Sequence, residues 1–352
     1  MTSGYLDEIY EQPEALRRCG AEFREGQGDA LKRIRQGVES RKFDKIVLTG
    51  MGASLHSCYP LYLKLSRTCS IPVLQWDALE LAHFVQQILS ERTLVIAVSQ
   101  SGESAELRRI AAREEPAGLV VSITNEEDNT LAHWADVPLF TRAGAEASVS
   151  NKTYTAGLAA LHLLGAVILG ENLESAREEV YQTAGQLAAS LQTLNEHMLR
   201  LGTHLGSVDF LAFVGRGVSL GSARAGSLIT QEASKLPCAA FSGGGFRHGP
   251  LELARPGFTA VVFAGPDETS RLNRRLAEEI CLAGGQVALI SPDAADSASI
   301  EGMSFISIPK AVPTLLPILE IVPVQLLTVP LAQAKGYRPA VFERASKVTA
   351  VE

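Results

Sequence analysis

A loop of hydroxyl side chains follows an apolar run in the first half of the chain. Residues 94–98 are Leu-Val-Ile-Ala-Val, residues 99–104 are Ser-Gln-Ser-Gly-Glu-Ser, and a helical pattern begins at Ala105. Backbone N–H groups at a helix start, with the positive end of the helix dipole behind them, favour an anion. The loop offers hydroxyl and amide donors but no lysine or arginine, and Gly102 permits close backbone approach. The pattern indicates a phosphate held by hydrogen bonds; the alternative is an ordinary capped loop of an α/β domain.

Two titratable side chains in the second half could move protons. Glu232 lies near the end of a predicted helix over residues 220–234, where the negative end of the dipole raises the pKa of a carboxyl. A raised pKa suits a general base near neutral pH, although a solvated helix residue is the plainer interpretation. His248 follows a predicted loop over residues 242–247 with three glycines, and an imidazole titrates near neutrality.

Composition restricts the class of protein. The chain has 352 residues, enough for two domains, with 46% hydrophobic and 20% charged residues, as in globular proteins. A net charge of −7 gives no electrostatic footprint for nucleic acid. Five cysteines without CxxC spacing indicate reduced thiols in a cytoplasmic protein, and the histidines lack metal-ligand spacing.

No membrane segment is expected. The acidic start is not a signal peptide. Residues 156–170 form too short an apolar run and contain His162, and residues 313–331 contain Glu320, Gln325 and several prolines. Both segments are predicted to be buried helices.

Four predicted strands of the first half recur in the second. The pairs are residues 44–50 and 209–214, 95–98 and 260–263, 120–123 and 287–290, and 137–140 and 305–308. Gly50 and Gly215 are offset by 165 positions, and the next two pairs by 165 and 167. This regularity predicts a duplicated unit with a parallel sheet covered by helices on both faces. Helical patterns surround the units at residues 6–40, 153–170, 173–201 and 320–336.

Several short motifs, in order, resemble the sugar isomerase (SIS) domain family. They are Met51-Gly52-Ala53-Ser54, residues 99–104, Val149-Ser150-Asn151-Lys152, Gly215-Arg216-Gly217, Glu232, Arg247-His248-Gly249-Pro250 and Ser346-Lys347-Val348-Thr349. The whole chain is similar to the isomerase half of glucosamine-6-phosphate synthase and to stand-alone relatives that deaminate or deglycate sugar phosphates. The resemblance implies an α/β fold of two tandem SIS domains, each a flavodoxin-like parallel sheet flanked by helices. We expect residues 1–200 to hold the first domain (core about 30–170) and residues 201–352 the second (core about 205–335) with a C-terminal tail.

The resemblance also implies a site. Substrate and phosphate contacts fall on Gly52, Ser54, Ser99, Gln100, Ser101, Ser104, Ser150 and Lys152. In the family, Glu232 moves a proton between C1 and C2 of the open sugar, His248 opens the ring, and Lys347 forms a Schiff base with the ketose. The histidine reaches the neighbouring subunit's site, which implies a homodimer with shared active sites; no cofactor or metal is implied.

Plainer interpretations stand beside these roles. Ser54 and Ser150 could be helix N-caps, Lys152 a surface charge, and Lys347 a tail lysine in solvent. The chain also departs from the family pattern at Ala53, often threonine there, and at residues 342–344, Phe-Glu-Arg, where the family has Pro-Arg.

Two features narrow the expected reaction. The start, Met1-Thr2-Ser3, lacks the nucleophilic cysteine of a glutaminase domain, and Ala225 and Ile229 stand where the synthase has a Glu and Lys pair. We expect a deaminase or deglycase acting on an amino-sugar or fructosamine 6-phosphate. The alternatives are an aldose–ketose isomerase of a hexose 6-phosphate and a non-catalytic sugar-phosphate-binding regulator.

Overall fold

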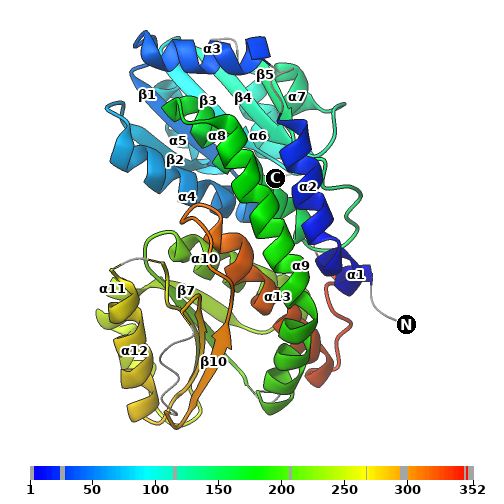
Figure 1. The fold of residues 1–352 in the computed structure, drawn as a ribbon, viewed down its shortest axis with the longest axis vertical. Coiled ribbons are helices and arrows are strands. Elements are labelled where there is room, and N and C mark those ends of the chain that lie inside the picture. Colours follow the sequence, from blue (N-terminus) through cyan, green and yellow to red (C-terminus); the bar gives the residue numbers. More distant parts are fainter. Residues whose placement is uncertain are drawn as a thin grey trace. The chain divides into compact units, whose positions relative to one another are not determined.

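The computed structural model describes residues 4–23, 28–113, 117–205, 208–266, 268–293, 300–344 and 346–347. The chain forms two compact units (Figure 1). One consists of Glu11–Ala184 with Phe342–Glu352, and the other of Met1–Tyr10 with Gly185–Val341. The two units divide between Ala184 and Gly185, inside the long helix α9 (Leu173–His204). The domain boundary expected from the sequence after residue 200 stays a prediction.

The unit of Glu11–Ala184 is built on a five-stranded parallel sheet. Its strands are β1 (Lys45–Gly50), β2 (Val73–Asp77), β3 (Thr93–Val98), β4 (Leu119–Thr124) and β5 (Val137–Phe140), in the order β2-β1-β3-β4-β5. Every residue of β3 and β4 is buried, as expected for parallel strands covered on both faces. Gly50 pairs with both Asp77 and Val98, so the strands end at one edge and their loops meet there.

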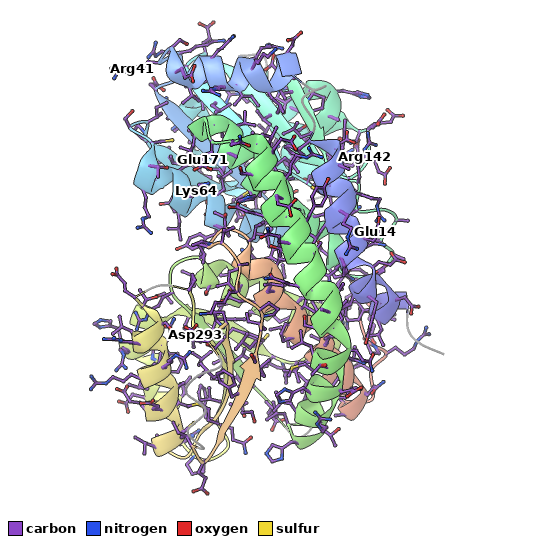
Figure 2. All side chains as sticks on the ribbon, viewed as in Figure 1. Glu14, Arg41, Lys64, Arg142, Glu171 and Asp293 are labelled. Carbon is purple, nitrogen blue, oxygen red and sulfur yellow. The ribbon has the colours of Figure 1, made fainter. Side chains whose placement is uncertain are left out.

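Helices cover the sheet of this unit. They are α2 (Gln12–Glu22), α3 (Gly28–Glu39), α4 (Gly52–Thr68), α5 (Ala78–Phe84), the 3-10 turn η2 (Gln86–Ile88), α6 (Ala105–Ala111), α7 (Thr130–Trp134) and α8 (Lys152–Leu169). Val47, Val95 and Val120 pack with side chains of α5, α6 and α7 in one apolar core. Alternate strand residues point to the other face, where α4 packs on α8. Lys64 of α4 joins Glu171, just beyond α8, in an ion pair of 2.6 Å (Figure 2).

The second unit repeats the same sheet. Its strands are β6 (Leu211–Gly215), β7 (Cys238–Ser242), β8 (Thr259–Phe263), β9 (Gln286–Ser291) and β10 (Met303–Ser307), in the order β10-β9-β8-β6-β7. All of its pairings are parallel, and the order is that of the first sheet with β6 in the place of β1. The predicted α/β fold of two duplicated parallel sheets is confirmed.

The helices of the second unit are α1 (Gly4–Tyr10), α10 (Ser219–Ser234), α11 (Gly243–Arg247), the 3-10 turn η3 (Pro250–Leu253), α12 (Ser270–Leu282) and α13 (Leu316–Ala334). Side chains of β6, β8 and β9 pack with those of α12 in an apolar core. α10 packs on α13 as α4 packs on α8. The residues between Ser242 and His248, predicted as a loop, form the short helix α11, because Ser242 Oγ accepts a hydrogen bond from Gly245 N at 2.9 Å and caps it.

Two helices, α8 and α13, are long and apolar enough to cross a membrane by length and composition. In each, 94% of the apolar window is buried inside the structure, so the prediction of buried helices is confirmed. A helix that is apolar on every side belongs in a protein core as readily as in a bilayer.

One carboxyl group is enclosed between α10 and α13. Glu320 of α13 is 0% exposed and accepts hydrogen bonds from Ser219 Oγ, at 2.7 Å, and from Ser222 Oγ. Burial raises the pKa of Glu320 from its ordinary 4.5 to about 7, although the two hydroxyl donors act in the opposite direction.

This raised pKa predicts a pH-dependent stability. A carboxyl with a raised pKa in the folded state binds more protons there than in the unfolded chain, so its contribution is full below pH 4.5 and is lost as the pH rises toward 7. We expect the unfolding free energy of the wild type, relative to Glu320→Gln, to fall by about 3 kcal/mol over that window. Urea denaturation of both proteins across this pH range measures the difference; a constant difference would contradict the prediction.

Candidate functional site

The hydroxyl loop over residues 99–104 has a shape that only glycine permits. Gly102 has φ of +67°, and a Cβ there would lie 1.8 Å from Asn129 Oδ1. Gly102 N donates to Ser99 Oγ at 3.0 Å, and Leu131 N donates to Gly102 O at 3.1 Å. These contacts fix the loop between the end of β3 and the start of α6.

The acid within the loop is structural. Glu103 accepts hydrogen bonds from Thr130 N at 2.5 Å and Thr130 Oγ1 at 3.0 Å, at the first residue of α7. The carboxylate is therefore directed to the helix start. Its negative charge is satisfied there by two donors.

The loop borders a small pocket at the ends of β3 and β4, lined by neutral side chains. Its lining is Ser54, Ser57, Val98, Ser99, Gln100, Ile123, Thr124, Thr141, Ser150, Thr153, Tyr154 and Gly157. Four of the predicted contact residues (Ser54, Ser99, Gln100 and Ser150) thus lie around one cavity. The lining contains hydroxyl groups from several elements and no charged side chain, as the composition of the loop indicates.

Ser104 has an unused hydroxyl group. It is the N-cap residue of α6, yet its side chain caps nothing, and Oγ is buried with no hydrogen-bond partner among the described residues. A buried hydroxyl without a partner costs free energy, so Ser104 has a donor available for a ligand, although it is not in the pocket lining. Ser101 differs, because its Oγ already accepts a hydrogen bond from Glu103 N at 3.2 Å.

The capping interpretation of the two other serines is wrong. The N-cap of α4 is Met51, and that of α8 is Asn151, whose side chain accepts a hydrogen bond from Lys152 N. Ser54 and Ser150 therefore keep their hydroxyls at the pocket. Gly52, with φ of +50°, begins α4 and is not part of the lining.

Lys152 is neither in the pocket lining nor on the surface. It is 2% exposed, and its ammonium group forms an ion pair with Glu11. The interpretation of Lys152 as a surface charge is wrong, because this lysine lies in the first turn of a buried helix and pairs with Glu11, the residue that precedes α2.

Lys347 is tied to the start of α8. Its Nζ donates to Glu146 Oε2 at 3.0 Å and to Ser148 O at 2.6 Å, and its side chain is 23% exposed. The interpretation as a tail lysine in solvent is wrong. Val348 and Thr349, which complete the tail motif, lie outside the described residues.

Glu146, which no sequence motif singles out, links this lysine to the pocket. Its side chain is 0% exposed and accepts hydrogen bonds from Asn151 N and Thr153 N, each at 3.0 Å. Thr153 Oγ1 also donates to Glu146 at 2.7 Å and lies 2.9 Å from Ser150 Oγ. A continuous set of hydrogen bonds therefore runs from Lys347 through Glu146 and Thr153 to Ser150 in the pocket lining.

Glu232 and His248 belong to the other unit. Glu232 is partly buried and lies two residues before the last residue of α10, which ends where Lys235 adopts φ of +59°. Lys235 Nζ donates to the Glu232 carbonyl and to Val341 O, the latter at 2.9 Å. His248 is exposed at the end of α11. Gly243 of that helix lies against Arg216, since a Cβ there would be 2.5 Å from Arg216 Nε.

The comparisons with known proteins agree with this architecture. The chain is 30% identical over 354 residues to glutamine–fructose-6-phosphate aminotransferase (isomerizing) of Pyrococcus horikoshii, covering 99% of this chain and 57% of that protein. The chain therefore spans little more than half the length of this curated relative.

Two solved structures show the same fold. The C-terminal domain of glucosamine-fructose-6-phosphate aminotransferase from Francisella tularensis superposes with a TM-score of 0.85 at 22% identity, covering 97% of this chain and 98% of that one. Glucosamine-6-phosphate deaminase from Thermotoga maritima gives a TM-score of 0.74 at 22% identity, with coverage of 98% and 99%. Residues 41–167 and 205–333 each match the SIS domain family, and the chain belongs to that family with two copies of its domain.

Proposed function

We propose that this chain is a sugar-phosphate enzyme that deaminates or deglycates an amino-sugar or fructosamine 6-phosphate. The observation that carries the proposal is the uncharged hydroxyl pocket, which is joined by hydrogen bonds to the amino group of Lys347. The aminotransferase relative and the deaminase of the same fold are both named for sugar 6-phosphates, which supports the substrate class. The proposal includes a cytoplasmic homodimer.

In this proposal the phosphate accepts hydrogen bonds from the loop over residues 99–104. Ser99 and Gln100 of the pocket lining provide neutral donors, and Ser101 and Ser104 of the same loop, which are not in the lining, add their hydroxyls. The Ser104 hydroxyl is buried and has no partner among the described residues. Hydrogen bonds to an ionised acceptor are stronger than those between neutral groups. Neutral donors therefore hold the anion, and the specificity comes from their geometry.

The chemistry of the proposal begins with ring opening by His248. Glu232 then takes the proton from C2 of a 2-amino aldehyde as O1 gains a proton, and returns it to C1 as the amino group loses one, which converts the substrate into an imine at C2. The amino group of Lys347 exchanges with that imine, ammonia leaves, and water releases the ketose phosphate from the lysine. Glu146 holds the amino group at the end of the hydrogen bonds that lead to the pocket, and in this proposal its carboxylate accepts the proton that Lys347 loses before the amine attacks the imine.

The first test concerns the phosphate contact of Ser104. We expect a sugar 6-phosphate, but not the unphosphorylated sugar, to raise the melting temperature. Ser104→Ala should weaken sugar-phosphate binding by about 1–3 kcal/mol and leave the unliganded protein as stable as before, since its Oγ loses no hydrogen bond there. Ser122→Ala is the matched control, because Ser122 Oγ is also buried without a partner among the described residues but lies within β4 and not in the loop over residues 99–104. Equal stabilisation by both sugars would contradict the phosphate site.

The second test concerns the reaction. Glucosamine 6-phosphate, fructosamine 6-phosphates and hexose 6-phosphates are incubated with the protein, and free ammonia and amine are measured. Glu232→Gln should fold and bind normally and lower turnover by roughly two to four orders of magnitude. Glu301 is exposed, and Glu301→Gln should leave turnover unchanged. Interconversion of hexose phosphates without amine release would identify an isomerase instead. Binding without any turnover would identify a regulator.

The third test concerns Lys347. Borohydride added with fructose 6-phosphate should trap a covalent adduct on Lys347, found by mass spectrometry of the digested protein. Lys347→Ala should bind the sugar phosphate and lose turnover, while Lys310→Ala, at a lysine whose side chain is 76% exposed, should change neither. An untrapped enzyme whose Lys347→Ala form turns over at the normal rate would remove the lysine from the mechanism.

A further inference from the structure

The duplication carries the serines of the pocket into the second unit. Ser54 and Ser57 lie in the first two turns of α4, after β1, and Ser219 and Ser222 lie 165 positions later in the first turn of α10, after β6. α4 packs on α8, and α10 packs on α13. The two pairs of serines therefore occupy equivalent places in the two units.

Their surroundings differ. In the first unit both serines line the pocket, and the opposing residue of α8 is Gly157, where a Cβ would still be 3.6 Å from Ser57 Oγ. Ser57 Oγ donates back to the carbonyl of Ser54 in its own helix, at 2.7 Å. In the absence of a side chain from α8, the space in front of the serines stays open.

In the second unit a carboxyl group fills this place. Ser219 Oγ donates to Glu320 Oε1 at 2.7 Å, and Ser222 Oγ donates to the other carboxyl oxygen. Glu320 is 0% exposed, and both of its oxygens have hydroxyl partners. A carboxylate between two hydroxyl donors has the contacts that a bound anion would have.

The loop after β8 has also lost its donors. At the same offset of 165, Ser99, Gln100 and Ser101 correspond to Ala264, Gly265 and Pro266. The loop still borders the serines, since a Cβ on Gly265 would lie 3.4 Å from Ser219 Oγ. Asn273 Nδ2 donates to Ala264 O at 3.0 Å, which fixes the loop from the side of α12.

We infer that Glu320 is a built-in occupant of the second copy of the anion pocket, so that one chain binds a single sugar phosphate, at residues 99–104. The count of sugar phosphates rests on the proposed function. The occupancy by Glu320 does not, because it rests on the hydrogen bonds of the second unit alone. Removal of the side chain leaves two serine hydroxyls facing an enclosed space, and the ligand class that fits it is a small carboxylate such as formate or acetate.

The first experiment empties this place. Glu320→Gly should melt several degrees below the wild type, and formate or acetate at tens of millimolar should recover part of the loss, whereas chloride at equal ionic strength should not. Glu320→Gln, which keeps the volume and one acceptor oxygen, should not respond to formate. A folded Glu320→Gly protein on which formate and chloride act equally would overturn the inference.

The second experiment adds a carboxyl group at the equivalent place in the first unit. It tests the inference if Glu320→Gly does not fold. Gly157→Glu should place a carboxyl group in front of Ser57 and abolish sugar-phosphate binding, while Gly157→Ala, whose Cβ makes an ordinary contact, should retain it. Retained binding in folded Gly157→Glu would overturn the inference.

Calorimetry with the wild type gives the stoichiometry. One sugar phosphate per chain supports the inference, and two per chain overturn it. Absence of any binding contradicts the proposed function, and the formate response of Glu320→Gly then decides the inference independently.

Discussion

The candidate site depends most on the buried carboxylate of Glu146. A single side chain, 0% exposed, receives two backbone N–H groups at the start of α8, the hydroxyl of Thr153 and the ammonium of Lys347. An isolated buried charge is strongly unfavourable, so all of these donors have to be in place together. The same carboxylate therefore fixes the helix start, the orientation of two hydroxyls near the pocket and the position of a residue from the C-terminal tail.

The pocket itself is organised by a different rule. The parallel strands place their loops at one edge of the sheet, and the residues there are neutral. The nearby charges are all engaged elsewhere: Glu103 with the first residue of α7, Lys152 with Glu11, and Lys347 with Glu146. Because the pocket lining has no charged side chain, an anion there would be held by hydrogen bonds and not by an ion pair, which favours recognition by geometry over simple charge attraction.

Much of the architecture follows from local sequence patterns. Buried parallel strands are continuous apolar runs, so the four duplicated strands and their offset can be recognised in the sequence itself. The hydroxyl loop is equally recognisable, because glycine and small donors follow a strand directly. The short helix α11 is not predictable in this way, since three successive glycines are poor helix formers and the turn depends on the cap from Ser242 and on the burial of Phe246 in the apolar core.

The charged positions are harder to predict, because their partners are distant in sequence. Lys152 is buried through Glu11, 141 positions away, and Glu146 is joined to Lys347, 201 positions away. The one local signal for Glu146 is that it is the only charged residue between residues 143 and 151, in a segment of small neutral residues just before a helix. Sequence spacing alone cannot specify such pairs, since tertiary packing decides which charge is enclosed.

The two units also show how a duplicated fold changes its chemistry without changing its framework. The second unit has the same sheet order and parallel strand pairing as the first, and α10 packs on α13 as α4 packs on α8. The pair of serines after the first strand is also present in both units. The two units differ in what faces those serines, a glycine in α8 and a glutamate in α13, and in the loop after β8, which has Ala264, Gly265 and Pro266 in place of Ser99, Gln100 and Ser101. Hydroxyl donors need an acceptor wherever they are buried, and that acceptor can come from a ligand or from the chain itself. In the second unit that acceptor is Glu320, which makes the serines part of a structural contact, and the same parallel framework holds both arrangements.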